Sequence, residues 1–361
     1  MKSKWEYKKL GEVCDYPNRR IAIKDLSIGE YIGVEHLIKN KGGLRRSTQM
    51  PDAENAIEFC IGDVLIGNIR PYLRKIWLAH FNGGASGDVI VVRTKREFSN
   101  KIFPSYLYKV LSSENFFEYD NNNTKGAKMP RGDRNAIAEY LIPVPPLDEQ
   151  QRIVAELDLL TSVIDKQKAQ LKELDTLAQS IFYDMFGDKT IQKTKWQKCH
   201  VGDVYKFQYG KGNKIPENKG IYPCYGSNGI VGFHTEYNSE DAPIIGHIGA
   251  YAGIVNWAQG KHFVTYNGVM CWLKNRDRFN SIYGYYMLKS QDYMSQARGG
   301  AAQPFVSYDM LETPEILVPP LPLQQEFADK IQSIEKQKAA INQSIADTQT
   351  LLDYTMDKYF G

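Results

Sequence analysis

The sequence predicts a mixed α/β protein built from two tandem copies of one unit, each closed by a long helix. Three observations lead to this fold class. The first is an internal repeat of roughly 180 residues. The second is a set of short apolar runs bounded by Gly, Asn and Asp, which is typical of strands and turns. The third is a heptad spacing of apolar residues at the end of each copy, which is typical of a coiled coil.

The repeat consists of matched segments that follow one another in the same order in both copies. The distance between matched residues shortens along the chain, so the middle of the unit varies while its two ends hold. A constant frame around a variable interior indicates a common scaffold that carries two different recognition surfaces. The matched pairs are Trp5 with Trp196, Gly11 with Gly202, 65–69 with 244–248, 144–147 with 318–321, 150–151 with 324–325, and 186–187 with 360–361.

Each copy begins with a mixed segment, residues 1–146 in the first copy and 188–320 in the second. Short apolar runs in these segments predict strands, and two further stretches predict short helices. The class is α/β or α+β, because the pattern does not determine the strand order. The expected strands include 64–66, 89–92 and 269–272, and the expected short helices are 105–111 and 283–288.

Each copy ends in a predicted long helix, residues 147–187 and 321–361. The alternative is that each helix packs on its own domain, but a small domain rarely covers a helix of about ten turns. We therefore expect the two helices to cover each other along one apolar seam. The seam residues are Ile153, Leu157, Leu160, Ile164, Leu171, Leu174 and Ile181 in the first helix, and Phe327, Ile331, Ile334, Ile341, Ile345 and Leu352 in the second.

Polar residues also mark these helices. Asp148 and Gln151 predict a capping box at the start of the first helix, directly after the Pro145-Pro146 pair. Polar residues at four seam positions are expected to fix the register of the helices at some loss of stability. These residues are Gln167, Lys338, Thr348 and Thr355.

Composition excludes little by itself. A formal net charge of +3, from 45 basic and 42 acidic residues, is too mild to identify a nucleic-acid-binding protein. The sequence has no run of about 18 apolar residues, so we expect no membrane span, and its first residues do not resemble a signal peptide. Five scattered cysteines without a Cys-x-x-Cys pair predict reduced thiols and a cytoplasmic protein.

The two helix starts resemble one protein family. Residues 144–154, Val-Pro-Pro-Leu-Asp-Glu-Gln-Gln-Arg-Ile-Val, look like the start of the central helix in the specificity subunits of Type I restriction-modification systems. Residues 318–328 are a weaker version of the same segment, and 300–304 and 244–257 are similar to further family segments. The resemblance covers essentially the whole chain. It departs at Pro322-Leu323, where the first copy has Asp148-Glu149 and a carboxylate cap is lost.

The resemblance implies two target-recognition domains held apart by an antiparallel pair of helices. It implies a subunit that reads an asymmetric, two-part site in double-stranded DNA. Expected partners are two copies of the modification (methyltransferase) subunit, which use adenosylmethionine, and a motor-nuclease subunit, which uses ATP and Mg. The outer faces of the helices are expected to bind these partners. The alternatives are a recognition subunit of a Type II-like modification enzyme, an enzyme with an unfamiliar site, and a coiled-coil scaffold that binds no DNA.

Candidate DNA-binding residues follow from phosphate and base chemistry. Arg and Lys suit phosphates and guanine, and amide side chains suit adenine. A surface cation is often only a solvated charge, and Tyr often only packs in a core. The first-domain candidates are Arg19, Arg20, Arg45, Arg46, Arg70, Arg74, Lys75, Lys125, Lys128, Arg131 and Arg134, and the second-domain candidates are Lys211, Lys214, Lys219, Tyr225, Asn228, His247, Arg298 and Gln303.

No pattern in the sequence predicts catalysis. It lacks an Asn/Asp-Pro-Pro-Tyr/Phe segment, a glycine-rich turn for an adenosyl cofactor, and a Gly-x-x-x-x-Gly-Lys-Ser/Thr phosphate loop. The six histidines show no metal-ligand spacing. We therefore expect no catalytic residue, no metal and no cofactor in this chain itself.

Overall fold

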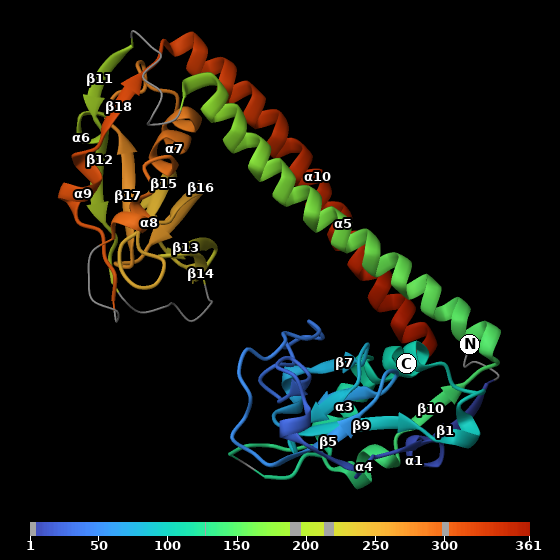
Figure 1. Cartoon of the computed structure of the whole chain (residues 1–361). Coiled ribbons are helices and arrows are strands. Elements are labelled where there is room, and N and C mark those ends of the chain that lie inside the picture. The colour runs from blue at the N-terminus through green and yellow to red at the C-terminus, as the bar shows by residue number, and fades with distance from the viewer. Residues whose placement is uncertain (1–4, 127, 188–195, 213–219, 298–302) are drawn as a thin grey trace. The chain divides into compact units, whose positions relative to one another are not determined.

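The computed structural model describes residues 5–126, 128–187, 196–212, 220–297 and 303–361. The chain divides into two units, residues 1–168 with 343–361 (unit 1) and residues 169–342 (unit 2). Each unit contains one strand-rich domain and a part of both long helices, α5 (Leu147–Phe186) and α10 (Leu321–Phe360) (Figure 1). Each of these helices spans 40 residues.

Unit 1 contains two four-stranded sheets and a separate strand pair. The pair is β1 (Glu6–Lys9) with β10 (Leu141–Val144), and it is antiparallel. One sheet has the order β2-β9-β6-β7, from Cys14–Asp15, Val89–Thr94, Val64–Gly67 and Ile76–Leu78. The other has the order β3-β5-β8-β4, from Arg20–Ala22, Asn55–Phe59, Gly83–Ala85 and Tyr31–Ile32. The short helices of unit 1 are α1 (Leu10–Val13), α2 (Pro104–Leu111), α3 (Glu114–Asn122), α4 (Arg134–Ala138), η1 (Ile23–Asp25), η2 (Pro71–Leu73) and η3 (Arg96–Phe98).

Unit 2 has one large sheet in place of the two. Its strand pair is β11 (Gln197–His200) with β18 (Glu315–Val318), again antiparallel. The six-stranded sheet has the order β12-β17-β15-β16-β13-β14, from Tyr205–Tyr209, Gly268–Leu273, Ser239–Gly246, Val255–Val264, Tyr222–Gly226 and Gly229–His234. The short helices are α6 (Val201–Val204), α7 (Ser281–Lys289), α8 (Tyr293–Gln296) and α9 (Tyr308–Glu312).

The two units share a four-stranded antiparallel frame. The order β2-β9-β6-β7 in unit 1 corresponds to β12-β17-β15-β16 in unit 2. The central strands end in the same register, with Gly67 opposite Val89 and Gly246 opposite Gly268. The predicted repeat is therefore a structural repeat. The units differ in the strands added to this frame, which come from the variable middle of each copy.

The central strand of unit 1 shows why this frame is stable. All four residues of β6 are buried, and its three apolar side chains alternate between two apolar clusters as a strand with a period of two must. Ile66 packs in the cluster that includes α2 and the start of α5, whereas Leu65 packs on the opposite face with Phe59 and Trp77. A strand that is covered on both faces has a continuous run of apolar residues in its sequence, as β6 does.

The long helices pair antiparallel in each unit. In unit 1, Ile153 and Leu157 near the start of α5 share a core with Tyr359 and Phe360 at the end of α10. In unit 2, Phe182 near the end of α5 contacts Phe327 near the start of α10 at a ring-centroid distance of 5.6 Å. Every predicted seam residue is buried or half-buried. The prediction of a shared apolar seam is confirmed.

Of the four polar seam residues, Gln167 and Lys338 pair across the seam, whereas the hydroxyls of Thr348 and Thr355 donate to the carbonyls of Ser344 and Leu351 in their own helix. Nε2 of Gln167 donates a hydrogen bond to Oγ of Ser344 at 2.6 Å in unit 1. Nζ of Lys338 lies 2.8 Å from Oδ1 of Asp175 in unit 2. Oε1 of Gln167 is buried without a hydrogen-bond partner in the described part of the chain. Such groups fix helix register but lower the stability of the pair.

The predicted capping box is wrong. The helix α5 begins at Leu147, so Asp148 lies inside its first turn and cannot be the N-cap residue. Gln150 supplies the polar contacts at this helix start. Its Nε2 donates to the carbonyl oxygens of Lys101 and Pro145 at 2.7 and 2.8 Å, and its Oε1 accepts from the Phe103 N–H at 2.9 Å. The Pro146 carbonyl already accepts the first helical hydrogen bond, from the N–H of Gln150, which places the helix start before Asp148.

The helix α10 begins at Leu321 and carries Pro322 in its first turn, where proline costs no hydrogen bond. No helix among the described residues has the length and apolar character needed to cross a membrane. All five cysteines are free thiols. The cytoplasmic location stays a prediction.

Candidate nucleic-acid interface

In unit 1, a basic loop is fixed to the end of the central strand. Lys125 and Arg131 exchange two backbone hydrogen bonds of 2.8 and 3.0 Å across this loop, residues 125–134. The Arg70 N–H donates to the Pro130 carbonyl at 2.8 Å, and the Gly132 N–H donates to the Asn68 carbonyl at 3.1 Å. These bonds hold the loop against the chain that leaves β6.

The cations of this loop differ in how strongly they are tied to acidic groups. The Arg131 guanidinium pairs with Asp88 at 3.1 Å, and the Lys125 amine pairs with Asp133. The Arg134 carbonyl accepts a hydrogen bond from the Tyr16 hydroxyl at 3.0 Å. Among the described residues, the exposed Lys128 has no ion-pair partner, so its amine is available to a phosphate.

Two cations beside the loop already have structural roles. The Arg74 guanidinium lies 2.7 Å from the Glu114 carboxylate. The Lys75 amine donates to the Val34 carbonyl at 2.6 Å, and burial lowers its pKa, an effect increased by the nearby charge of Arg45. By contrast, Arg70 is exposed and has no ion-pair partner in the described chain. We therefore expect Arg70 to be more accessible to a phosphate than Arg74 or Lys75.

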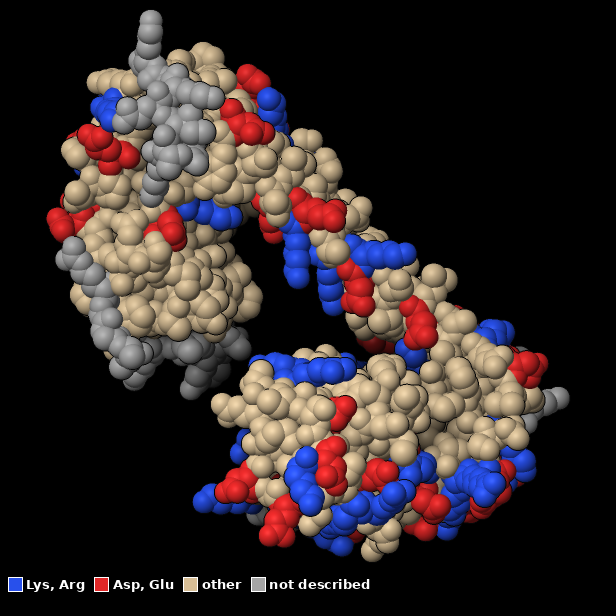
Figure 2. Space-filling model, in the orientation of Figure 1, with Lys and Arg blue, Asp and Glu red and all other residues tan. Residues whose placement is uncertain are grey.

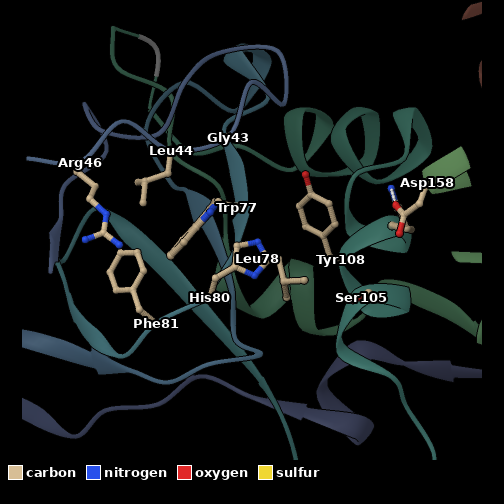
Figure 3. A pocket seen from close by; sticks show the side chains of 11 residues that line it. Gly43, Leu44, Arg46, Trp77, Leu78, His80, Phe81, Ser105, Tyr108 and Asp158 are labelled. Carbon is tan, nitrogen blue, oxygen red and sulfur yellow. Dashed lines mark ion pairs between the residues drawn. The ribbon is translucent and has the colours of Figure 1, made fainter. Parts of the chain in front are cut away.

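The remaining candidates of unit 1 lie elsewhere. Arg19 pairs with Glu58 at 3.0 Å, and its neighbour Arg20 begins β3 in the second sheet. The Arg46 guanidinium lies 4.4 Å from the centre of the Phe81 ring, at the edge of a cavity of about 580 Å³ (Figure 3). On the visible face of unit 1, Lys and Arg are interspersed with Asp and Glu rather than forming one uniform patch (Figure 2).

In unit 2, the same end of the frame carries stacked aromatic rings. The His247 ring stacks on Tyr209 at a centroid distance of 4.1 Å, and Tyr308 stacks on Tyr209 at 4.2 Å. Tyr266 contacts His247 edge-on at 5.0 Å. Nδ1 of His247 lies 3.0 Å from the Tyr266 carbonyl oxygen. These contacts fix the imidazole in one orientation.

The other described candidates of unit 2 lie on separate segments of the domain. Lys211 follows β12 and donates its N–H to the Val264 carbonyl at 3.0 Å. The Tyr225 carbonyl accepts from the N–H of Thr265, the residue next to Tyr266. The exposed Asn228 lies in the β13–β14 turn, and Gln303 precedes Pro304, whose carbonyl accepts from the Gly249 N–H at 2.8 Å. Lys214, Lys219 and Arg298 lie outside the described residues.

The sequence did not single out several residues at these two strand ends. They include Asn68, Asp88 and Asp120 in unit 1, and Tyr209, Tyr266 and Tyr308 in unit 2. The match of 65–69 with 244–248 could have revealed Asn68, because this match sets Asn68 opposite His247. The aromatic stack could not have been found this way, since its rings come from three distant segments.

Asp120 is an unusual group under the basic loop. Its side chain is only 1% exposed, and its Oδ1 is buried without a hydrogen-bond partner in the described chain. Burial raises the pKa of this carboxyl to about 6. A Cβ added at Gly132 would lie 2.5 Å from this oxygen, so any larger residue there would have to displace the Asp120 side chain. No cluster of three or more His, Cys, Asp or Glu side chains suited to a metal occurs among the described residues.

A family model matches both copies of the repeat. It is described as the Type I restriction modification DNA specificity domain, and it matches residues 2–176 and again residues 193–348. The chain belongs to this family. The two specificity domains thus correspond to the two copies, and each match includes the strand-rich domain and most of the long helix that follows it.

Relatives and solved structures agree with the family. The chain is similar to the specificity subunit of the Type I restriction enzyme EcoDI from Escherichia coli, with 29% identity over 140 residues. That match covers 37% of this chain and only 30% of the relative.

Two solved structures share the fold of the paired specificity domains over nearly the whole chain. One is a chain from a study of complex assembly and conformational transition of the type I R-M system, with a TM-score of 0.59 and 21% identity, covering 99% of this chain and 97% of that chain. The other is the S subunit of a Type-I restriction-modification system from M. genitalium, with a TM-score of 0.57 and 15% identity, covering 99% of this chain and 96% of that chain.

Proposed function

We propose that this chain is the DNA-reading subunit of a Type I restriction-modification complex and recognises an asymmetric, two-part sequence in double-stranded DNA. One observation carries the proposal. The two domains share one antiparallel frame, but the ends of their central strands carry different chemistry, a basic loop in unit 1 and an aromatic cluster in unit 2. Two domains with different recognition residues are expected to bind two different half-sites in the DNA.

Binding would combine phosphate and base contacts. Lys128 and Arg70 in unit 1 and Lys211 in unit 2 are exposed and suit phosphates, which supply affinity but little sequence information. Each small domain can read only a few base pairs in a groove. Because α5 and α10 contribute to both units, we expect insertion of whole heptads in both helices to change the gap between the half-sites.

The chemistry would come from partner subunits. In this proposal, two modification subunits with adenosylmethionine methylate adenine in the two half-sites, and a motor-nuclease subunit with ATP and Mg cleaves unmodified DNA. The chain itself contributes no catalytic group. The exposed faces of α5 and α10 are the proposed docking surface, because the opposite face of each helix is occupied by the seam.

The decisive experiment is genome-wide mapping of N6-methyladenine in a host without DNA methylation. The chain is co-expressed with the methyltransferase subunit encoded beside it. We expect one asymmetric, gapped motif that disappears when this chain is omitted. If both proteins are soluble and co-purify but no motif appears, the specificity role is wrong for this chain.

A further inference from the structure

Asn68 and His247 occupy the same backbone position in the two units. Each directly follows the glycine that ends the central strand, Gly67 or Gly246. The Asn68 N–H donates to the Asp88 carbonyl at 2.9 Å, and the His247 N–H donates to the Asn267 carbonyl at 2.8 Å. The backbone is thus held identically, while the side chain differs.

The loop that follows is attached in the same way in both units. The Asn68 carbonyl accepts from the Gly132 N–H at 3.1 Å, and the His247 carbonyl accepts from the Val306 N–H at 3.0 Å. The next residue in each unit forms an isolated antiparallel bridge, Ile69 with Arg131 and Ile248 with Phe305. Both side chains therefore sit between a fixed strand end and a fixed loop that contains candidate DNA-binding residues.

The His247 side chain offers a defined hydrogen-bond acceptor. A carbonyl oxygen can only accept, so Nδ1 must carry the proton that it donates to the Tyr266 carbonyl. In the neutral ring, Nε2 is then an acceptor, and it has no hydrogen-bond partner among the described residues. His247 is 6% exposed, and its ring packs against Tyr209 and Tyr266.

One atom of the Asn68 side chain likewise lacks a partner among the described residues. Its Oδ1 is buried and accepts no hydrogen bond from any described residue. Oδ1 of Asp120 is also buried and has no hydrogen-bond partner among the described residues. Both oxygens lie close to Gly132, at 3.1 Å for Asn68 and 2.5 Å for Asp120 from a Cβ built on this glycine. An unpaired buried polar group costs stability, so we take these two oxygens as a sign of a partner that the described residues do not supply.

We infer that Asn68 and His247 are equivalent specificity-determining residues, each reading a base edge in one half-site. This inference rests on the proposed function. The Nε2 acceptor of His247 fits an exocyclic amine, the N6 group of adenine or the N4 group of cytosine. Because Oδ1 of Asn68 is buried, this amide can offer a base only its Nδ2 donor, which fits an acceptor on a purine edge such as N7. Tyr209 and Tyr266 act as positioning residues for the imidazole.

The test uses two shape-preserving substitutions, His247→Phe and Asn68→Leu, in the full chain co-expressed with its methyltransferase subunit. The methylation motif is mapped, and binding is measured to the cognate duplex and to duplexes with single base substitutions. We expect each substitution to relax one base position in one half-site only. The preference for the correct base should fall roughly 10- to 100-fold at that position. Lys198→Gln, on the distant strand β11, is the matched control and should leave the motif unchanged.

A second pair of variants tests the inference in case the first substitutions prevent folding. Asn68→His and His247→Asn exchange the two residues, and we expect each exchange to change the preferred base at the same position. Thermal unfolding and co-purification with the methyltransferase subunit identify folded variants. A wild-type motif that persists unchanged in all folded variants overturns this inference alone. Absence of any motif for the wild-type chain instead defeats the proposed function.

Discussion

Gln150 and Gln324 make the same three hydrogen bonds in the two halves of the chain. Oε1 of Gln150 accepts from the Phe103 N–H, and Oε1 of Gln324 accepts from the Asn280 N–H, both at 2.9 Å. Each Nε2 donates to a carbonyl five residues back, that of Pro145 or Pro319, at 2.8 and 2.9 Å. The third bond goes to the carbonyl of Lys101 or Arg278, at 2.7 and 3.2 Å. Both glutamines are fully buried, and each ties a long helix to the frame of its own unit.

Replacement of Gln150 by leucine should destabilise unit 1. The substitution leaves one N–H and two carbonyl groups without partners in a buried place, which we expect to cost about 2 to 4 kcal/mol. Urea unfolding followed by circular dichroism measures the change. The exposed neighbour provides the control, because Gln151→Ala removes no described hydrogen bond and should have little effect. Equal effects of the two substitutions would contradict the anchoring role of Gln150.

Replacement of Gln167 by leucine should stabilise the helix pair. The substitution fills a half-buried seam position with an apolar side chain and removes the buried, unpaired Oε1. The Ser344 hydroxyl can turn to a carbonyl of its own helix. We expect a gain of about 1 kcal/mol in the free energy of unfolding. A lower melting temperature in Gln167→Leu than in the wild type would show that this amide stabilises the helix pair and does not only fix its register.

Asp120 should make stability depend on pH. Burial raises the pKa of its carboxyl from the usual 3.8 to about 6. Below about pH 4 the group is protonated in both states. Between pH 4 and 6 the unfolded chain releases the proton while the folded chain keeps it, so the free energy of unfolding falls as pH rises, by up to about 3 kcal/mol.

Asp120→Asn tests this relationship. The variant should be more stable than the wild type at pH 7, and the difference should shrink toward zero at about pH 4. Thermal unfolding over this pH range provides the measurement. If the two proteins have parallel stability profiles, Asp120 does not carry a raised pKa in the folded chain.

Gly132→Ala should displace the basic loop of unit 1. The new Cβ would lie 2.5 Å from Oδ1 of Asp120, and we expect a cost of about 1 to 3 kcal/mol together with weaker recognition of one half-site. Gly87→Ala is the control, since no atom lies within 4 Å of its added Cβ. The double variant Gly132→Ala, Asp120→Ala removes the clash and should recover part of the loss. If the double variant recovers nothing, the loss in Gly132→Ala does not come from a clash between the new Cβ and Asp120.

Lys128→Gln should weaken DNA binding without changing the motif. A phosphate contact contributes affinity to every sequence alike, and its loss should reduce the slope of log affinity against log salt concentration by about one. Titrations of a fluorescent duplex at several salt concentrations give the slope. Lys198→Gln again serves as the control. A change in the methylated motif would instead make Lys128 a base-reading residue.

The sequence by itself determined the repeat, the two long helices and their apolar seam. These features are periodic along the chain, and a period of 3.5 or 2 residues can be read without knowledge of distant contacts. The match of 65–69 with 244–248 likewise placed Asn68 and His247 at equivalent positions. It could not indicate that either side chain would lack a hydrogen-bond partner.

Only the tertiary structure decided which strands share a sheet and which polar groups meet. Unit 2 extends its frame with β13 and β14, whereas unit 1 builds a second sheet beside its frame. The stack of Tyr308, Tyr209 and His247 and the burial of Asp120 and Gln150 likewise join residues far apart in sequence. Local patterns encode the conformation of each segment, but pairing between segments depends on which arrangement buries the most apolar surface while satisfying the buried polar groups.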